Sequence, residues 1–313
     1  MRLRQAILAL CAAAPSLACA PVPGEGRFVR IETEEALIIW DEAAQRQHFI
    51  RRASFETDAK DFGFLVPTPG KPELAAVDER AFESLGVITG RSVPGVTVLE
   101  QKMVAGYDAT VLEATDAKAL DDWLRSNGYP SSPGLSEWVK PYVERKWKIT
   151  AFKIAGGSPK VAGGAVRMSF QTPRPFFPYR EPAAAGSKER MLRIYFLADA
   201  RFRAIVGDYE PWAGAAVWSG SIDRTQLEQL LKRVRLPPLA GGGGRRLTEF
   251  EDRSSPRRGG GELFFERAAD QSMLARAPVQ RFPAASGTMI ALLAIAILVL
   301  IGGSWFLIRR NRG

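Results

Sequence analysis

The stretch that decides the fold is RQHFIRRASFETDAKDFGFLVPTPG, residues 46–70. Its first ten residues have the two-residue alternation of a β-strand, which places Phe49 and Arg51 on one face. The opposite face carries three long side chains: His48, Ile50 and Arg52. A second apolar run, Phe62–Val66, predicts another strand that ends at Pro67. The stretch therefore predicts two consecutive strands of a β-rich region.

The same stretch holds the only histidine of the chain, His48, and the triplet Asp61-Phe62-Gly63. In protein kinases a DFG triplet works beside a glycine-rich loop, a strand lysine and an H-R-D catalytic loop. The sequence contains no H-R-D, because Phe49 follows the single histidine. We therefore interpret the triplet as part of a strand, with its glycine at a bend or bulge. His48 is interpreted as a partly exposed strand residue, whose protonation nearby arginines disfavour, rather than as a general base.

Other motifs of catalytic and metal sites are also missing from the sequence. One histidine and two cysteines are too few for most zinc or thiol sites. A Ser-His-Asp triad would need His48, and no G-x-S-x-G elbow is present. The glycine-rich AGGSPKVAGGA, residues 155–165, lacks the G-K-[ST] ending of a phosphate-binding loop. We predict no catalytic residue, no cofactor and no metal ligand, and leave open a hydrolase that uses paired carboxylates.

The N-terminus has the layout of a secretory signal peptide over residues 1–20. A basic start precedes the apolar run Ala6–Leu17, and Ala18–Ala20 offers a signal-peptidase site. An alternative interpretation is a lipoprotein signal in which Cys19 is lipidated and becomes the new N-terminus. Ser16 departs from that pattern, because lipoprotein signals usually have a branched apolar residue at this position.

The C-terminal segment Thr288–Ile308 carries no charge and is long enough to cross about 30 Å of hydrocarbon as a helix. Trp305 lies near its end, where the membrane interface is expected. Arginines in residues 309–313 predict a cytoplasmic tail and an exported domain on the other side of the membrane. A sorting signal that is later cleaved is the alternative, but no L-P-x-T-G motif precedes the segment.

The net charge of +9 comes largely from the two ends of the chain. Five arginines lie in the signal peptide and the tail, and subtracting them leaves +4 for the exported part: Arg2, Arg4, Arg309, Arg310 and Arg312. A weak positive charge gives no reason to expect nucleic-acid binding, which needs a concentrated basic surface. Both cysteines, Cys11 and Cys19, precede the exported part, which must therefore be stable without an internal disulfide.

Between the two ends, strands outnumber helices. Asp116 or Thr115 is placed to cap a helix that ends near residue 127, and Asp223 is placed to cap a helix that extends to about Arg235. A helical pattern also covers Leu135–Val143, where a proline is expected to break it. We predict a mainly antiparallel α+β domain over residues 21–266, which forms either one lobe or two. A small hairpin over Thr248–Glu266 and a tether over residues 267–287 complete the chain before the transmembrane helix.

Several motifs together resemble a known bacterial family. They are ALIIWD, QHFIRRASF and DFGFLVPTPGKPEL, followed by ATVLEATDAKALDDWLRSNGY, SFQTPRPFFPYREP and LTEFEDRSSPR. Their order and spacing are similar to those of the family called domain of unknown function 2330. The resemblance implies an exported protein, often with a membrane anchor. It implies no activity, so it assigns no catalytic residues.

The segment TPRPFFPYREP, residues 172–182, is the strongest candidate for recognition of a partner. Prolines restrict its backbone and hold Phe176, Phe177 and Tyr179 close to Arg174. Rigid aromatic rings beside arginine are typical of protein-binding surfaces. The alternative is that these rings fold back and cover one end of the sheet.

We predict a single-pass protein of the bacterial cytoplasmic membrane with its domain exported to the periplasm or the cell exterior. The domain is expected to bind or scaffold an envelope protein or glycan, and the protein contacts the lipid bilayer through residues 288–308. A carboxylate-dependent envelope hydrolase is the alternative. Converging Asp and Glu side chains in a deep cleft would favour the hydrolase, and an aromatic surface without them would favour the binding domain.

Overall fold

The computed structural model describes residues 17–18, 20–22, 27–91, 108–126, 129, 133–155, 160–180, 190–208, 211–239, 244–254 and 261–277. The chain divides into a compact unit that ends at Arg276 and a second unit that begins at Ala277. Cys19, most of the predicted signal peptide and the predicted transmembrane helix 288–308 lie outside the described residues. Among the described residues, no helix has the length and apolar character needed to cross a membrane.

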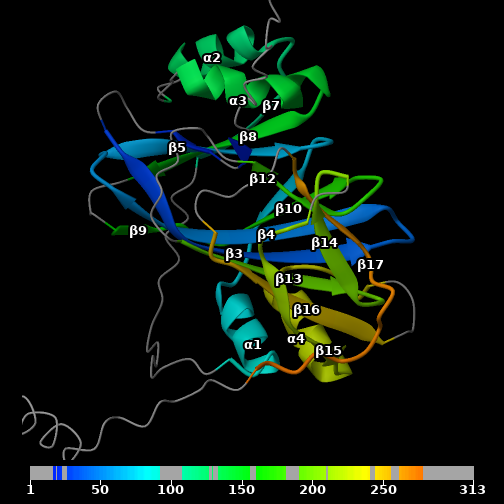
Figure 1. Cartoon of the computed structure of the whole chain (residues 1–313). Coiled ribbons are helices and arrows are strands. Elements are labelled where there is room, and N and C mark those ends of the chain that lie inside the picture. The colour runs from blue at the N-terminus through cyan, green and yellow to red at the C-terminus, as the bar shows by residue number, and fades with distance from the viewer. Residues whose placement is uncertain are drawn as a thin grey trace, which may run out of the picture. The chain divides into compact units, whose positions relative to one another are not determined.

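A large sheet forms the centre of the compact unit (Figure 1). In spatial order its strands are β15 (Ala215–Ile222), β16 (Arg245–Asp252), β13 (Met191–Ala198), β3 (Val29–Asp41), β4 (Arg46–Thr57), β10 (Val166–Gln171) and β6 (Glu73–Ala76), and β9 (Lys160–Ala162) also pairs with β4. We call it the main sheet. Its pairs are antiparallel except β13 with β3. The predicted α+β class with mainly antiparallel strands is confirmed.

The hairpin of β3 and β4 contains the first half of the stretch that decides the fold. β3 is one long strand, and its register with β4 shifts between Ile31 and Thr33. β4 covers the predicted strand, and its alternation separates the two faces as predicted. Phe49 packs into the core on one side of the main sheet, and Ile50 packs into the core on the other.

A second sheet has the order β2 (Ala20–Val22), β5 (Asp61–Thr68), β8 (Lys148–Ala155) and β7 (Asp108–Leu112). β5 continues through Pro67, which was expected to end it. β2 pairs with β5 at Gly63–Leu65, and no strand of the described residues pairs with that edge of β5 at Pro67, where a residue without N–H is tolerated. The register of β5 with β8 is continuous across Gly63, so the predicted bend or bulge is absent there.

A third sheet has the order β11 (Phe176–Phe177), β17 (Leu263–Arg267) and β14 (Phe202–Val206). One large apolar core joins residues of the main, second and third sheets. A further pair, β1 (Leu17–Ala18) with β12 (Tyr179–Arg180), lies within the compact unit. The predicted hairpin over Thr248–Glu266 is wrong, because β16 and β17 belong to different sheets.

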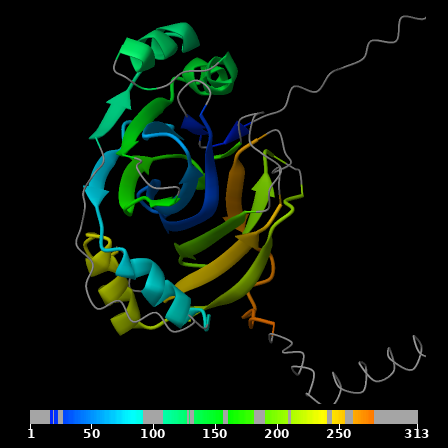
Figure 2. The same ribbon diagram turned by 90° about the vertical axis from the view of Figure 1, so that its left-hand side faces the viewer.

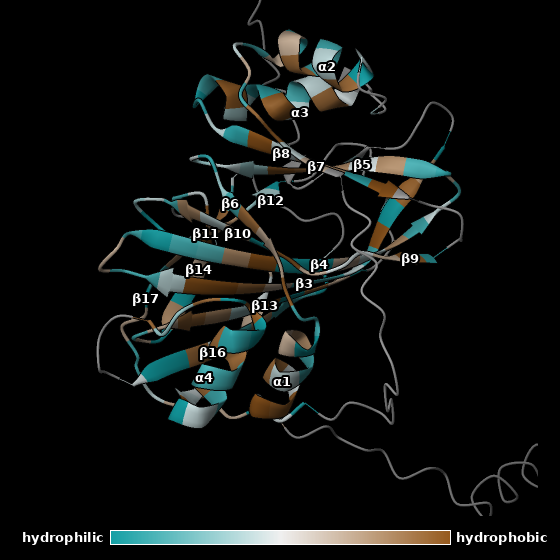
Figure 3. Cartoon of the chain, turned by 180° about the vertical axis from the view of Figure 1, so that it is seen from behind, coloured by the Kyte–Doolittle hydropathy of each residue, from teal (hydrophilic) through white to brown (hydrophobic). Residues whose placement is uncertain are grey.

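Helices cover the outer faces of the sheets (Figure 2). α1 (Arg80–Ile88) and α4 (Arg224–Arg233) pack on the main sheet, and α2 (Ala117–Ser126) and α3 (Pro133–Glu144) pack on the second sheet. In Figure 3 the strands of the main sheet carry long hydrophobic segments, whereas much of α4 is hydrophilic. Apolar faces are therefore buried between layers, and polar helix faces lie outside.

Two predicted helix starts are confirmed by their capping bonds. Asp116 Oδ1 accepts a hydrogen bond from the backbone N–H of Ala119 (2.8 Å), and Asp223 Oδ1 accepts one from Gln226 (2.8 Å). These bonds satisfy N–H groups that have no partner within the first helical turn. The starts of α2 and α4 could thus be predicted from the local sequence.

The break expected at Pro141 is absent, because α3 runs through it. A proline inside a helix removes one backbone hydrogen bond. Four side chains on both sides of the proline are buried against the second sheet: Trp138, Val139, Tyr142 and Val143. Their packing outweighs the lost hydrogen bond.

The first residues of the predicted tether contact the compact unit. Leu274 and Ser219 exchange two backbone hydrogen bonds of 2.9 Å, and Arg276 pairs with buried Glu249. Arg267 also forms an ion pair with Asp199 (2.9 Å). The residues from Arg267 to Arg276 are thus held against the sheets.

Candidate functional site

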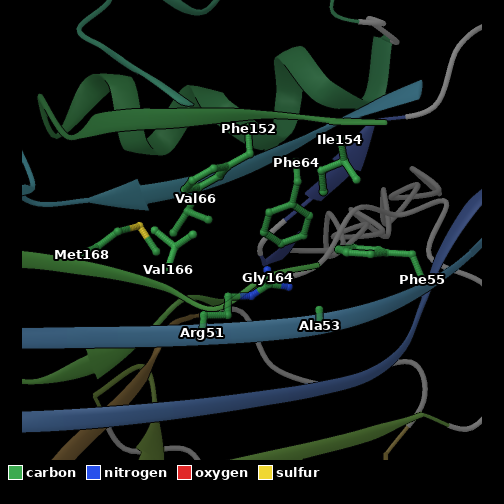
Figure 4. A pocket seen from close by; sticks show the side chains of 10 residues that line it. All are labelled: Arg51, Ala53, Phe55, Phe64, Val66, Phe152, Ile154, Gly164, Val166 and Met168. Carbon is green, nitrogen blue, oxygen red and sulfur yellow. The ribbon is translucent and has the colours of Figure 1, made fainter. Parts of the chain in front are cut away.

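A pocket lies between the main sheet and the second sheet (Figure 4). Its lining residues are predominantly apolar: Arg51, Ala53, Phe55, Phe64, Val66, Phe152, Ile154, Gly164, Val166 and Met168. It contains about 330 Å³ of space between atoms, counted out to its open mouth. Only about 20 Å³ of that space admits the centre of a water-sized sphere, so the pocket is a narrow slot.

Strand alternation explains why these side chains meet. Every second residue of β4, β10, β5 and β8 points into the space between the two sheets. The large rings of Phe55, Phe64 and Phe152 form much of the wall. Ala53 carries only a methyl group, which leaves volume that a larger side chain would fill.

Arg51 is the charged residue among the described lining residues of the pocket. It is 8 % exposed, and its Nε donates a hydrogen bond to Oε1 of Glu34 at 2.7 Å. Glu34, on the neighbouring strand β3, is 0 % exposed. The guanidinium carbon lies 3.8 Å from the centre of the Phe64 ring, as expected for a cation–π contact. The ion pair is therefore desolvated and fixed between an aromatic ring and a carboxylate.

One nitrogen of this guanidinium is not satisfied by the pair. Arg51 Nη2 is buried and has no hydrogen-bond partner among the described residues. A buried N–H without an acceptor costs about 1–3 kcal/mol. Because this nitrogen is buried, the packed side chains enclose it and do not present it to the pocket.

His48 lies on the opposite face of β4 from Arg51. It is 7 % exposed, so the expectation of a partly exposed side chain is wrong. Its Nδ1 lies 2.8 Å from Oγ of Ser169, which is also buried. Burial, and to a lesser extent the positive charges of Arg46 and Arg167, lower the pKa of His48 to about 4. The histidine is thus a neutral core residue on the side of the main sheet away from the pocket.

The aromatic residues of the Pro-rich segment are in the core. Phe176 is 1 % exposed, Phe177 is 0 % exposed and Tyr179 is 1 % exposed. Phe177 packs edge-to-face on Phe49, with ring centroids 5.8 Å apart. The rings therefore offer no surface to a partner, which corrects the hypothesis of a recognition loop. Their position fits the alternative in which they cover the sheet.

Polar contacts hold this segment in place. The side-chain amide of Gln47 donates to the carbonyl oxygen of Phe176 (2.8 Å) and accepts from its N–H (2.9 Å). Glu262 accepts hydrogen bonds from Tyr142 Oη (2.7 Å) and from the N–H of Tyr179 (2.8 Å). Burial raises the pKa of Glu262, and the two hydrogen bonds lower it in part. The backbone of the segment is thus hydrogen-bonded to Gln47 of the main sheet and to Glu262, which precedes β17.

Arg174 is the member of the predicted set that reaches the surface. Its Nη1 lies 3.0 Å from Oδ1 of Asp208, and its side chain is 36 % exposed. The guanidinium also lies 3.9 Å from the centre of the Phe264 ring. These contacts join the segment to Asp208 and Phe264. Arg174 lies at the surface whereas the three predicted aromatic partners are buried, so the four residues form no common surface.

The described residues bring no group of three or more His, Cys, Asp or Glu into metal-binding proximity. No Asp or Glu occurs among the described residues that line the pocket. Its chemistry is therefore an apolar wall with one guanidinium.

No curated protein matches this sequence. Among solved structures, the chain is similar to baculovirus P35, with 7 % identity and a TM-score of 0.39 over 78 % of this chain and 99 % of that one. It is also similar to a mutated baculovirus P35 after caspase cleavage, with 6 % identity and a TM-score of 0.34 over 79 % and 100 % of the two chains. Likeness at this level supports no conclusion about shared fold or function.

A family model described as "Uncharacterized protein conserved in bacteria (DUF2330)" matches residues 89–255, more than half of the 313-residue chain. The match includes β8 and β10 of the pocket, whereas β4 and β5 precede it. The chain belongs to the bacterial DUF2330 family.

Proposed function

We propose that the domain is a binding module that takes a slim apolar ligand into the pocket between β4, β10, β5 and β8. The observation that carries this proposal is an apolar slot between two sheets with one guanidinium, that of Arg51, among its described lining residues. Small-molecule sites typically combine apolar walls with a few placed polar groups, which is the composition found here.

The dimensions of the pocket restrict the ligand. Its open room, about 20 Å³ or one water-sized sphere, is far below the roughly 300–1,000 Å³ of ligand pockets, so a ligand has to displace the walls to enter. The small water-sized volume of about 20 Å³ excludes bulky ring systems. A single unbranched hydrocarbon chain suits such a slot best.

Binding is favoured over carboxylate-dependent hydrolysis. A glycosidase of the usual type needs two carboxyl groups on either side of the scissile bond. The described lining residues supply none, and Glu34 is already paired with Arg51. The described lining residues thus offer a hydrophobic surface for a ligand and contain no pair of carboxylates.

The exported location remains part of the proposal. A signal peptide over residues 1–20 and a membrane helix over residues 288–308 would hold the domain close to a bilayer. Lipids and their derivatives are the apolar compounds with single long chains that such a location supplies. An envelope lipid or lipid-modified component is therefore the proposed class of partner.

Photolabelling of the full chain in lipid nanodiscs tests this function. An alkyl diazirine probe without a polar head is expected to label peptides that contain the pocket residues Phe152, Ile154 and Met168. Val166→Trp places a large ring beside Arg51, since the two residues are register partners on β10 and β4. This variant should reduce pocket labelling at least about fivefold.

Val87→Trp is the matched control, because Val87 is 71 % exposed on α1 and far from the lining set. It should label like the wild-type protein, and near-ultraviolet circular dichroism should show that both variants fold. Labelling spread evenly over the surface, or unchanged in Val166→Trp, would contradict the proposed function.

A further inference from the structure

We infer that the second sheet and the helices packed on it open as one layer over the pocket, and that a hydrogen bond between Tyr142 and Glu262 keeps this layer closed. This inference rests on the proposed function and concerns how a ligand enters its site. A pocket with room for about one water-sized sphere has to widen before a hydrocarbon chain can enter. The contacts between the two sheets determine which wall moves.

The second sheet, α2 and α3 form one body. They share an apolar core of their own, whose members include Leu65, Leu124, Leu135, Trp138 and Ile149. The two helices also lie in the chain between β7 and β8, which are neighbouring strands of that sheet. In Figure 1 both helices lie on the far side of this sheet from the main sheet. We call the sheet and the two helices the second layer, and its movement as a unit leaves this core intact.

Two short connections fix the line about which the second layer can turn. Residues 58–60 join β4 to the start of β5, and residues 69–72 join the end of β5 to β6. Because β4 and β6 belong to the main sheet, β5 is tied to that sheet at both ends. A body attached at two points turns about the line between them, which is the geometry of a hinge. The other links of the second layer, residues 92–107 and 156–159, lie outside the described residues.

A turn about β5 widens the pocket on the side of β8. This strand lines the pocket with Phe152 and Ile154, and β10 of the main sheet lines it with Val166 and Met168. β8 neighbours β5 in the second sheet, so it moves away from β10 when the layer turns. Whatever holds α3 and β8 against the rest of the fold therefore controls access to the pocket.

The hydrogen bond between Tyr142 and Glu262 holds that side of the second layer. Tyr142 lies on α3, and its Oη donates to Oε1 of Glu262 at 2.7 Å. Glu262 precedes β17 of the third sheet, and its Oε2 accepts a hydrogen bond from the N–H of Tyr179 on β12 at 2.8 Å. One carboxyl oxygen is thus bound to β12 while the other binds α3. We call the Tyr142–Glu262 bond the latch.

A column of aromatic rings connects the latch to the pocket. The ring centroids of Tyr142 and Trp147 are 5.5 Å apart, those of Trp147 and Phe176 are 5.1 Å apart, and those of Phe176 and Phe170 are 5.9 Å apart. Trp147 directly precedes β8, and Phe170 follows the pocket residue Met168 by two positions on β10. Apolar contacts have little directional preference, whereas a hydrogen bond needs a short distance and a narrow range of angles. The latch is therefore the contact that opening breaks outright.

The reactivity of two introduced thiols measures the opening in the full chain. Ala53→Cys places a thiol in the pocket wall, and Ala165→Cys places one in the core between the main sheet, α1 and α4. The two alanines are 7 % and 3 % exposed. Reaction with N-ethylmaleimide is followed by mass spectrometry on the peptide that contains each position, so Cys11 and Cys19 do not contribute. Each rate is divided by the rate in urea.

In the otherwise wild-type chain, the thiol of Ala53→Cys should react at least about tenfold faster than that of Ala165→Cys. The reason is that the second layer opens without global unfolding, whereas the other core opens only when the whole domain unfolds. Equal rates at the two positions would overturn the inference. This comparison needs no change at Tyr142, so the inference can fail even if a Tyr142 variant does not fold.

Tyr142→Phe removes the donor of the latch and keeps the ring. It should raise the rate at Ala53→Cys about tenfold, a factor that corresponds to about 1.4 kcal/mol. Tyr179→Phe is the matched control, because its Oη also donates to a buried carboxylate, Oδ2 of Asp252 at 2.7 Å, and neither residue belongs to the second layer. Both variants destabilise the folded chain, so both should raise the slow rate at Ala165→Cys. Only Tyr142→Phe should raise the rate at Ala53→Cys, and an equal rise in Tyr179→Phe would overturn the latch.

The alkyl diazirine probe separates this inference from the function on which it rests. Faster thiol reaction in Tyr142→Phe together with pocket labelling in nanodiscs supports both. Thiol rates as expected, but no pocket labelling in any protein, would contradict the proposed function and leave the latch standing. Pocket labelling with no effect of Tyr142→Phe at Ala53→Cys would overturn the latch and leave the function standing.

Discussion

Glu34 and Arg51 form a buried ion pair between adjacent strands, with Arg51 Nε 2.7 Å from Glu34 Oε1. Arg51 lies opposite Ala36 in the register of β3 and β4, so Glu34 is its diagonal neighbour two residues along β3. Both side chains are on the face of the main sheet that packs into the large apolar core. The pair places a guanidinium, hydrogen-bonded to a buried carboxylate, inside a hydrophobic layer.

Removing only the cation should destabilise the domain. Arg51→Met removes the buried N–H donor that contacts the buried Glu34 carboxylate, and we expect a loss of about 3–5 kcal/mol in the free energy of unfolding. Adding Glu34→Leu should recover most of that loss, because two apolar side chains replace both charges. Urea unfolding followed by tryptophan fluorescence measures both effects. A double variant as unstable as Arg51→Met would refute this account of the pair.

The aromatic rings of the Pro-rich segment should contribute to stability. Phe177 is 0 % exposed, so Phe177→Ala should lower the free energy of unfolding by about 3–5 kcal/mol. Phe28→Ala makes the same change at a ring that is 47 % exposed, and it should cost about 0.5 kcal/mol or less. Chemical denaturation compares the two. Similar small effects at both positions would restore the interpretation of a surface recognition loop.

The stability of the domain should fall in mild acid because of His48. Its folded-state pKa is about 4, below the ordinary value of 6.5, because of burial and the charges of Arg46 and Arg167. Between these two values the unfolded chain binds a proton that the folded chain does not, so lowering the pH favours unfolding. The contribution of the neutral histidine is fully present above pH 6.5 and is lost by about pH 4, up to about 3 kcal/mol.

His48→Gln removes this titration, so its free energy of unfolding should change less between pH 6.5 and pH 4 than that of the wild-type protein. Denaturation at a series of pH values provides the measurement. Parallel pH profiles for the two proteins would show that His48 titrates normally. A loss of cellular function in a well-folded His48→Gln protein would point instead to a role in chemistry.

The orientation in the membrane is a separate prediction from the C-terminal arginines. A reporter that works only in the cytoplasm should be active when fused after Gly313. The same reporter inserted at residues 241–243, between α4 and β16, should be inactive because that loop is expected to be exported. The reverse pattern of activities would contradict the proposed topology.

Local features of the fold were accessible from sequence. The alternation of residues 46–55 gave β4 and assigned its faces, and capping residues gave the starts of α2 and α4. These signals depend on near neighbours in the chain. The continuation of α3 through Pro141 was missed because packing on the second sheet, which overrides the local preference, is a long-range property.

The pocket could not be predicted from the sequence, although one signal for it was present. Alternation placed Arg51 on the same face as Phe49, and a charge on an apolar face indicates a buried partner or a ligand. Its partner Glu34 could not be identified, because the sequence alone does not give the register of β3 with β4. The strands that face each other across the apolar layer are also brought together by residues far apart in the chain. β16 and β17, for example, follow each other in sequence but belong to different sheets.

The most direct test of the central claim is native mass spectrometry of the full chain purified from its own membranes, compared with Val166→Trp. The account predicts one small bound molecule per wild-type chain, with a single hydrocarbon chain, that is depleted in Val166→Trp and retained in Val87→Trp. A wild-type chain that carries no adduct, or the same adduct in Val166→Trp as in the wild-type chain, would contradict it.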